Sequence, residues 1–200
     1  MDLISPGYTL NYYNSESIFF YVHDDYSTVE LAEGVNVSTY SHWGWRGDFV
    51  ESVFESIDPH LSVDFFQQFN WNGSHIDVYC VAPSLFDGTS VVGMALDWGN
   101  YYDVLWEPQY DLNFDQNTII HEIGHALGLG HPDGDGYSEL YNQNDTVMSY
   151  NSGPDGWRTW FSDHDISALQ AIWGVEQNVI HGGLTDDAIY SDANIKTEDF

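Results

Sequence analysis

Three histidines and a glutamate within one short segment have the residue types and the spacing of a catalytic metal centre. Residues 121–131 have the sequence HEIGHALGLGH, which places His121 and His125 four positions apart. Side chains four positions apart lie on the same face of an α-helix, so both imidazoles can reach one ion. Zinc accepts imidazole nitrogen ligands, and a catalytic zinc site keeps one coordination position open. The spacing therefore predicts a zinc site on a helix.

The third ligand has to come from outside the same helical turn, and the sequence provides a way to bring it back. Gly128 can adopt the left-handed conformation that ends a helix and turns the chain sharply. His131 follows three residues later, and Pro132 prevents the helix from continuing. We therefore expect His121, His125 and His131 to hold one Zn²⁺, with Gly128 as a structural residue of the site.

Glu122 lies next to a predicted zinc ligand but projects from a different edge of the helix. From that edge its carboxylate can contact a water on the metal without coordinating the metal itself. Zinc lowers the pKa of bound water to about 7, and a carboxylate within hydrogen-bond reach can take its proton. We expect Glu122 to act as this base and then to pass the proton to the leaving amine.

The full segment, together with Pro132 after it, resembles the serralysin branch of the metzincin metallopeptidases. Residues 146–150 (TVMSY) are similar to the Met-turn of that family, and residues 165–174 are similar to the helix that follows it. The resemblance implies that Met148 forms a hydrophobic floor beneath the zinc. It also implies that Tyr150 is an additional, displaceable zinc ligand whose hydroxyl stabilises the oxyanion, a role that a phenol beside a metal can perform.

Two features differ from the serralysin pattern. Residues 182–187 approximate one calcium-binding repeat, but Thr185 stands where a glycine belongs, and a single repeat has no neighbour to stack on. We therefore expect a catalytic domain without the calcium-binding β-roll of that family. The connection from His131 to Met148 is also short for a serralysin, and this connection helps to form the pocket beside the metal.

The segment Asp133-Gly134-Asp135-Gly136, with Glu139 nearby, offers oxygen ligands of the kind that Ca²⁺ prefers. Asp-Gly pairs are equally typical of turns, so both interpretations stay open. On the first interpretation, calcium is an expected cofactor in addition to one catalytic zinc ion. On the second, the segment is only a turn.

The surrounding pattern predicts the elements that position these residues. Alternating and β-branched residues predict strands at 18–22, 61–69, 76–82 and 91–96, and helical spacing predicts helices at 48–57, 115–127 and 162–174. Asp115 is the expected N-cap of the second helix, and Ser162 with Asp165 forms a capping box for the third. These elements predict an α+β zincin/metzincin-like domain with a twisted mixed sheet, an active-site helix, a Met-turn and a C-terminal helix. The expected organisation is an N-terminal segment (1–17), a catalytic domain (18–174) and a C-terminal tail (175–200).

The charge balance limits the classes of partner. The chain has 32 Asp and Glu residues but only three Lys and Arg residues, for a net charge of −29. Nucleic acids and anionic membranes bind through Lys and Arg, so neither is an expected partner. Residues 1–7 contain no basic region and no long apolar stretch, which argues against a cleavable signal peptide in this sequence. The family resemblance nevertheless implies a secreted, extracellular protein.

Two functions are compatible with these residues. The first is a zinc-dependent endopeptidase, a hydrolase that binds a polypeptide in extended form and cleaves it with a metal-activated water. The alternative is a non-catalytic, zinc-stabilised module of the same fold that binds a peptide or a protein. Glu122 favours the enzyme, because a carboxylate at this position has no structural role and costs desolvation free energy. We expect the protein to be a monomer.

Overall fold

The computed structural model describes residues 1–8, 16–31 and 34–177. Within these residues, seven strands form one sheet and three α-helices pack around it. The strands are β1 (Ser17–His23), β2 (Thr28–Glu30), β3 (Asn36–Tyr40), β4 (Asp64–Gln68), β5 (Ile76–Val81), β6 (Gly93–Asp97) and β7 (Tyr102–Trp106). The helices are α1 (Trp45–Ile57), α2 (Leu112–Ala126) and α3 (Asp163–Trp173). This arrangement confirms the predicted α+β class with a mixed sheet.

The central strands of the sheet run parallel, whereas β3 pairs antiparallel with β5 and the edge strand β6 pairs antiparallel with β7. β1 pairs in parallel with β4 and with β5, and β5 pairs in parallel with β7. β6 pairs antiparallel with β7, and it has no other strand partner within the described part of the chain. β6, which overlaps the strand predicted at 91–96, is therefore an edge strand that leaves one row of backbone N–H and C=O groups unpaired by any described strand.

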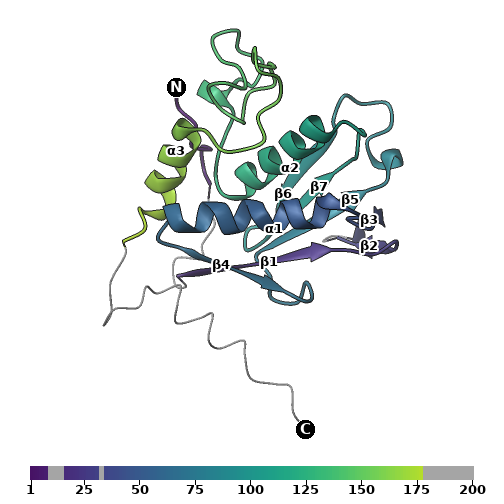
Figure 1. Ribbon diagram of the computed structural model, residues 1–200. Helices are drawn as coiled ribbons and strands as arrows, with labels where there is room; N and C mark the ends of the chain where they lie inside the picture. Colours follow the sequence, from purple (N-terminus) through teal and green to yellow (C-terminus); the bar gives the residue numbers. More distant parts are fainter. Residues whose placement is uncertain (9–15, 32–33, 178–200) are drawn as a thin grey trace.

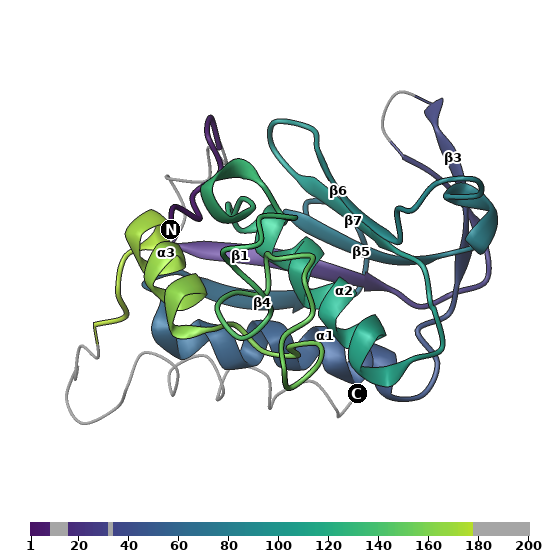
Figure 2. The ribbon, with the colours of Figure 1, turned by 90° about the horizontal axis from the view of Figure 1, so that it is seen from above.

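α1 and α2 run across the same side of the sheet, as Figures 1 and 2 show from two directions, and α3 lies at one end beside the N-terminal segment. β5 is buried at all six positions because both of its faces are covered. Val78 and Cys80 belong to the main core, which contains the inner faces of α1 and α2. Tyr79 and Val81 point to the other side, where a smaller core lies beneath β2 and β3.

Several predicted boundaries are confirmed and several elements were missed. The predicted capping box is present at the start of α3, where Ser162 and Asp165 exchange hydrogen bonds. The prediction of Asp115 as the N-cap of α2 was wrong. The helix begins earlier, and Asp111 is its N-cap because its carboxylate accepts a hydrogen bond of 3.1 Å from the backbone N–H of Phe114. The strands β2, β3 and β7 were not predicted.

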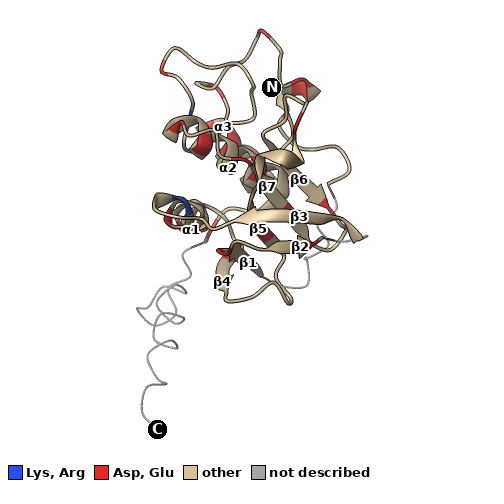
Figure 3. Cartoon of the chain, turned by 90° about the vertical axis from the view of Figure 1, so that its right-hand side faces the viewer, with Lys and Arg blue, Asp and Glu red and all other residues tan. Residues whose placement is uncertain are grey.

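Asp115 has a different role inside α2. Its carboxylate is buried, accepts a hydrogen bond of 2.8 Å from the backbone of Gln109, and lies 3.4 Å from the guanidinium of Arg46. Arg46 in turn lies over the ring of Trp43 at 4.2 Å. One of the few cations of the chain is thus used to neutralise a buried acid between α1 and α2. Figure 3 shows the contrast with the acidic residues, which are distributed over helices, strands and loops.

The first residues of the chain pack against the end of α2. Ile4 forms an antiparallel bridge with Leu129, and the backbone of Ser5 donates a hydrogen bond of 2.9 Å to Gly128. The predicted division at residues 17 and 174 stays a prediction. The segment 178–200, with its predicted partial repeat, lies outside the described residues. None of the described helices has the length and apolar character needed to cross a membrane.

Candidate metal centre

Helix α2 carries the first two candidate ligands on the side that faces away from the sheet core. Ile119, Ile120 and Ile123 are fully buried and fix the rotation of the helix. That rotation brings His121 and His125 to one face, where their ring centroids lie 4.7 Å apart. The local helical geometry predicted from the sequence is therefore present.

The chain leaves α2 through Gly128, which has φ of +102°. The backbone N–H of Gly128 donates to His125 and that of Leu129 donates to Gly124, at 3.0 and 2.8 Å, which closes the helix end. The turn brings His131 back toward the helix, and its ring centroid lies 5.4 Å from that of His121 and 4.9 Å from that of His125. Gly128 thus has the role that the sequence predicts.

The three imidazoles converge on a common point. One ring nitrogen from each of His121, His125 and His131 lies within 4.8 Å of the other two. The Nδ1 atoms of His121 and His125 donate to the backbone carbonyls of Val147 and Leu129, at 2.9 and 2.8 Å. Because a carbonyl can only accept, each Nδ1 carries the proton, and each Nε2 is left with a free lone pair.

A divalent metal fits this set of atoms. The Nε2 atoms of His121 and His131 are buried and have no hydrogen-bond partner among the described residues. A buried polar atom without a partner is unfavourable, and a shared cation would satisfy both atoms. Burial lowers the pKa of His121 well below its usual value, lowers that of His125 to about 4, and also lowers that of His131. All three rings are thus neutral near pH 7, which is the form that binds a metal.

Met148 and Tyr150 lie beside the three histidines. Met148 is fully buried, and its Sδ lies 2.9 Å from the point that a Cβ on Gly124 would occupy, directly against the ligand-bearing helix. The ring of Tyr150 lies 5.3 Å from that of His121 and 4.7 Å from that of His131. Burial, followed by the charge of Glu122, raises the pKa of Tyr150 to about 12, so its hydroxyl keeps its proton. Met148 and Tyr150 thus lie close to the histidines, and their roles as a floor beneath the zinc and as a zinc ligand stay predictions.

Glu122 lies between α2 and the edge strand β6. Its side chain is almost completely buried, and burial raises its pKa to about 8 against the opposing effect of a hydrogen bond from the backbone of Ala95. Gly93, on the same strand, leaves the space that the carboxylate occupies. A Cβ at Gly93 would lie 2.7 Å from Oε1 and 2.8 Å from Cγ of Glu122.

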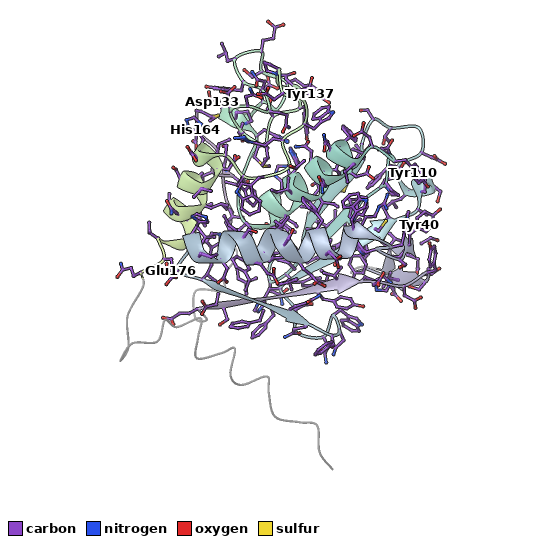
Figure 4. All side chains as sticks on the ribbon, viewed as in Figure 1. Tyr40, Tyr110, Asp133, Tyr137, His164 and Glu176 are labelled. Carbon is purple, nitrogen blue, oxygen red and sulfur yellow. The ribbon has the colours of Figure 1, made fainter. Side chains whose placement is uncertain are left out.

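A cleft of about 490 Å³ opens beside these groups. It runs between β6 and the loops that follow α2, and its lining includes His121, Glu122 and Tyr150 together with the aromatic rings of Phe114 and Trp157. Tyr137 also lines this cleft, and Figure 4 shows it on the loop above α2 with Asp133. The cleft is large enough for side chains of a bound polypeptide.

The sequence did not indicate all residues of this site. Gly93 and Ala95 contact Glu122 from β6, and Gly136 makes room for Tyr150, whose ring carbon lies 2.6 Å from the point that a Cβ would occupy. A glycine inside a strand is a signal of close approach by another group, and Gly93 carried that signal. Gly136 had no distinguishing signal, because it lies among other turn glycines.

The calcium interpretation of residues 133–139 stays a prediction. Within the described part of the chain, the histidine triad is the one group of three or more His, Cys, Asp or Glu side chains close enough to share an ion. The Asp133 carboxylate accepts hydrogen bonds from the backbone of Asp2 and from the hydroxyl of Tyr141, both at 2.6 Å. Asp135 accepts one of 2.9 Å from the backbone of Tyr137, as expected for a turn residue.

Comparison with known proteins identifies relatives by sequence. Serralysin G of Dickeya chrysanthemi is 36% identical over an alignment of 107 positions, and the match covers 45% of this chain and 22% of the relative. Serralysin C of the same organism is 32% identical over an alignment of 127 positions, and the match covers 52% of this chain and 24% of the relative. "Probable matrix metalloproteinase 095L" of Invertebrate iridescent virus 3 is 27% identical over an alignment of 158 positions, and the match covers 75% of this chain and 40% of the relative. The chain thus spans less than half the length of each relative.

No family model matches the chain. Among solved structures, that of myroilysin has a TM-score of 0.47 and 13% identity, with 86% of this chain and 89% of that chain covered. The GM1-bound form of the ECX AB5 holotoxin has a TM-score of 0.43 and 15% identity, with 84% and 76% covered.

Proposed function

We propose that this chain, as a serralysin-like metzincin, is a zinc-dependent endopeptidase that hydrolyses peptide bonds of extended polypeptides. One observation carries the proposal: three neutral imidazoles converge beside the buried carboxyl group of Glu122. In two of these imidazoles, the Nε2 atom has no hydrogen-bond partner among the described residues. The mixed sheet, α2, the Met-turn and α3 make up the α+β zincin/metzincin-like fold that presents these groups.

The three histidines would hold zinc, His121 and His125 through Nε2 while their Nδ1–H groups stay fixed on the backbone carbonyls of Val147 and Leu129. When bound, zinc supplies a Lewis acid that polarises the substrate carbonyl and acidifies a coordinated water. The pKa of Glu122, about 8 in the absence of a metal, would be lowered by the positive charge of a bound zinc. The Glu122 carboxylate would then accept a proton from the attacking water and return it to the nitrogen of the leaving amine. The hydroxyl of Tyr150, held beside His121 and His131, donates to the oxygen on which negative charge develops.

Substrate binding would use the edge strand β6. An extended peptide can add to its unpaired backbone groups as a further strand, with alternate side chains directed into the cleft lined by Phe114 and Trp157. The same strand carries Gly93 and Ala95, so the bound peptide would lie directly beside Glu122. This placement brings a peptide carbonyl close to the base and to the three ligands.

We further propose that the protein acts outside the cell as a monomer on polypeptide substrates, without nucleic acid or membrane partners. The extracellular location rests on the likeness to serralysins. The net charge of −29 supports the absence of nucleic acid and membrane partners, because it opposes binding to polyanionic surfaces.

Two measurements test the enzyme against the non-catalytic binding module. Purified protein should contain about one zinc per chain and cleave a general protease substrate, and a chelator should abolish cleavage. Glu122→Gln should retain zinc and lose hydrolysis by several orders of magnitude, since the amide cannot accept the proton. Glu55→Gln, at an exposed position of α1, makes the same chemical change far from the cleft and should leave hydrolysis unchanged. Zinc-loaded, folded protein without any hydrolysis would favour the binding module instead.

A further inference from the structure

A second cavity of about 490 Å³ lies on the side of the sheet that faces away from α2. Strands β2, β5 and β7 form its base, and the loops that precede β5 and β7 form its walls. The alternation along β5 explains the placement, because Val78 faces the helices while Asp77 and Tyr79 face the cavity. Nothing in the proposed hydrolysis uses this side of the sheet.

Two buried carboxylates lie side by side at the base of the cavity. Asp77 and Asp103 are register partners on neighbouring parallel strands, and they are only 4% and 2% exposed. Ser74 donates a hydrogen bond to Oδ1 of Asp77, and the indole of Trp98 donates one of 2.8 Å to Oδ2 of Asp103. The second oxygen of each carboxylate receives no hydrogen bond from any described residue.

The lining of the cavity contains no positive charge among the described residues. A third acid, Glu30, lies at its rim, so three carboxylates surround a space without Lys, Arg or His. Burial of a carboxylate without a cation is unfavourable. In agreement, burial raises the pKa of Asp77 to about 7 and that of Asp103 to about 6. The two acids thus lack the positive partner that would favour their charged forms.

Aromatic rings form the walls of the same cavity. Tyr79 and Tyr101 line it from β5 and from the turn before β7, and Trp71 lines it from the loop before β5. Trp71 is 64% exposed, which is unusual for so large an apolar side chain. Aromatic faces attract ammonium and guanidinium groups, and they also pack against the apolar stems that carry such groups. A bare metal ion would need neither the rings nor so large a volume.

We propose that this cavity binds an organic cation, an ammonium or guanidinium group on an apolar stem, with its charge beside Asp77 and Asp103 and its stem along Trp71 and Tyr101. Such a group occurs on lysine and arginine side chains and on free amines. The binding is non-covalent and independent of the proposed hydrolysis. The cavity volume lies in the range of sites for small ligands.

Calorimetric titration of the whole protein with butylguanidinium and butylammonium tests the proposal, with pentanol as the neutral analogue. Both cations should bind and pentanol should not. Asp77→Asn should weaken cation binding by roughly tenfold or more, because it removes a charged acceptor. Asp87→Asn removes the same charge at an exposed position near β6 and should leave the affinity unchanged. A lysine-containing peptide and its norleucine counterpart then distinguish a side chain from a free amine as the natural source.

Further variants keep the test decisive. Thermal unfolding verifies that each variant is folded, and Asp103→Asn replaces Asp77→Asn if the latter does not fold. Trp71→Ala, at an exposed position, should weaken binding severalfold through loss of the cation–π contact. Three results would overturn the proposal. Pentanol could bind as well as the two cations, or both folded Asp→Asn variants could keep the wild-type affinity. Calcium chloride or glucose could also bind in place of the two organic cations. The last result would mean a metal or sugar site, and complete absence of binding would mean a structural acid pair.

Discussion

Replacement of Gly93 by alanine tests whether β6 positions the proposed base. Gly93 is not one of the glycines with a positive φ, so alanine introduces no backbone strain there. Its Cβ, however, would lie 2.7 Å from Oε1 and 2.8 Å from Cγ of Glu122, and 2.8 Å from Cγ2 of Thr118. Ordinary contacts begin at 3.4 Å, so the end of the Glu122 side chain has to move by about 0.7 Å.

The size of this displacement sets the expected effect. A misplacement of about 1 Å at a reacting group can lower the rate by about 100-fold. We therefore expect Gly93→Ala to lower kcat by roughly 10- to 100-fold, which corresponds to about 1.4–2.7 kcal/mol of transition-state stabilisation. The free energy of unfolding should fall by about 1–3 kcal/mol, because the new Cβ also meets Cγ of Glu122 and Cγ2 of Thr118, which belong to packed side chains of α2. Zinc content should not change, since His121 and His125 keep their backbone partners.

The assay is the steady-state cleavage of a fluorogenic peptide, with zinc content and urea unfolding measured on the same preparation. Gly47→Ala is the matched control, because a Cβ there would lie 3.5 Å from the carbonyl oxygen of His42, an ordinary contact, within helix α1. The control should keep wild-type kcat. A Gly93→Ala protein that retains wild-type kcat, or whose activity falls only in proportion to its zinc content, would rule out a positioning role of β6 for Glu122.

Four further outcomes follow from the structure. Arg46→Met should lower the free energy of unfolding in urea by about 3–5 kcal/mol, because it leaves the buried Asp115 without its cation; a loss below about 1 kcal/mol would contradict this. Because burial raises the pKa of Asp77 to about 7 and of Asp103 to about 6, the folded protein keeps protons that the unfolded chain loses near pH 4. Stability should therefore fall as pH rises from about 4 to about 7, and Asp77→Asn should lessen the fall relative to wild type in urea titrations at several pH values. Tyr150→Phe should lower kcat by roughly 100-fold with little change in KM, and unchanged kinetics would exclude an oxyanion role. Removal of zinc by a chelator should lower the midpoint of thermal unfolding in calorimetry, and equal midpoints with and without zinc would argue against binding at the buried nitrogens.

The features that the sequence predicted correctly depend on residues close together along the chain. The capping box of Ser162 and Asp165 spans three positions, and the pair His121 and His125 spans four. Helical geometry fixes such distances without help from the rest of the fold. Gly128 belongs to the same class, because a glycine after the last helical turn indicates where the chain reverses.

The missed elements lack a local signal. β7 is buried at all five positions, so its polar and apolar residues do not alternate as those of a half-exposed strand do. Asp115 and Asp111 are equally suitable N-caps by residue type, and the contact of Asp115 with Arg46, 69 positions away, has no local signal. The contact of Gly93 with Glu122 likewise depends on how β6 lies against α2, which local spacing does not determine.

The position of the third ligand depends on contacts between distant parts of the chain. A Cβ at Gly128 would lie 2.7 Å from the ring of Tyr8 and 2.9 Å from Cδ1 of Ile172, so even a residue that tolerates positive φ has no room there. The backbone of Gly130 donates a hydrogen bond of 2.7 Å to Leu3 two residues after this turn. The N-terminal segment, α2 and α3 therefore meet at the turn that delivers His131. It follows that the motif of residues 121–131 supplies the ligands, whereas the packing of both ends of the described chain determines whether the third ligand reaches the other two.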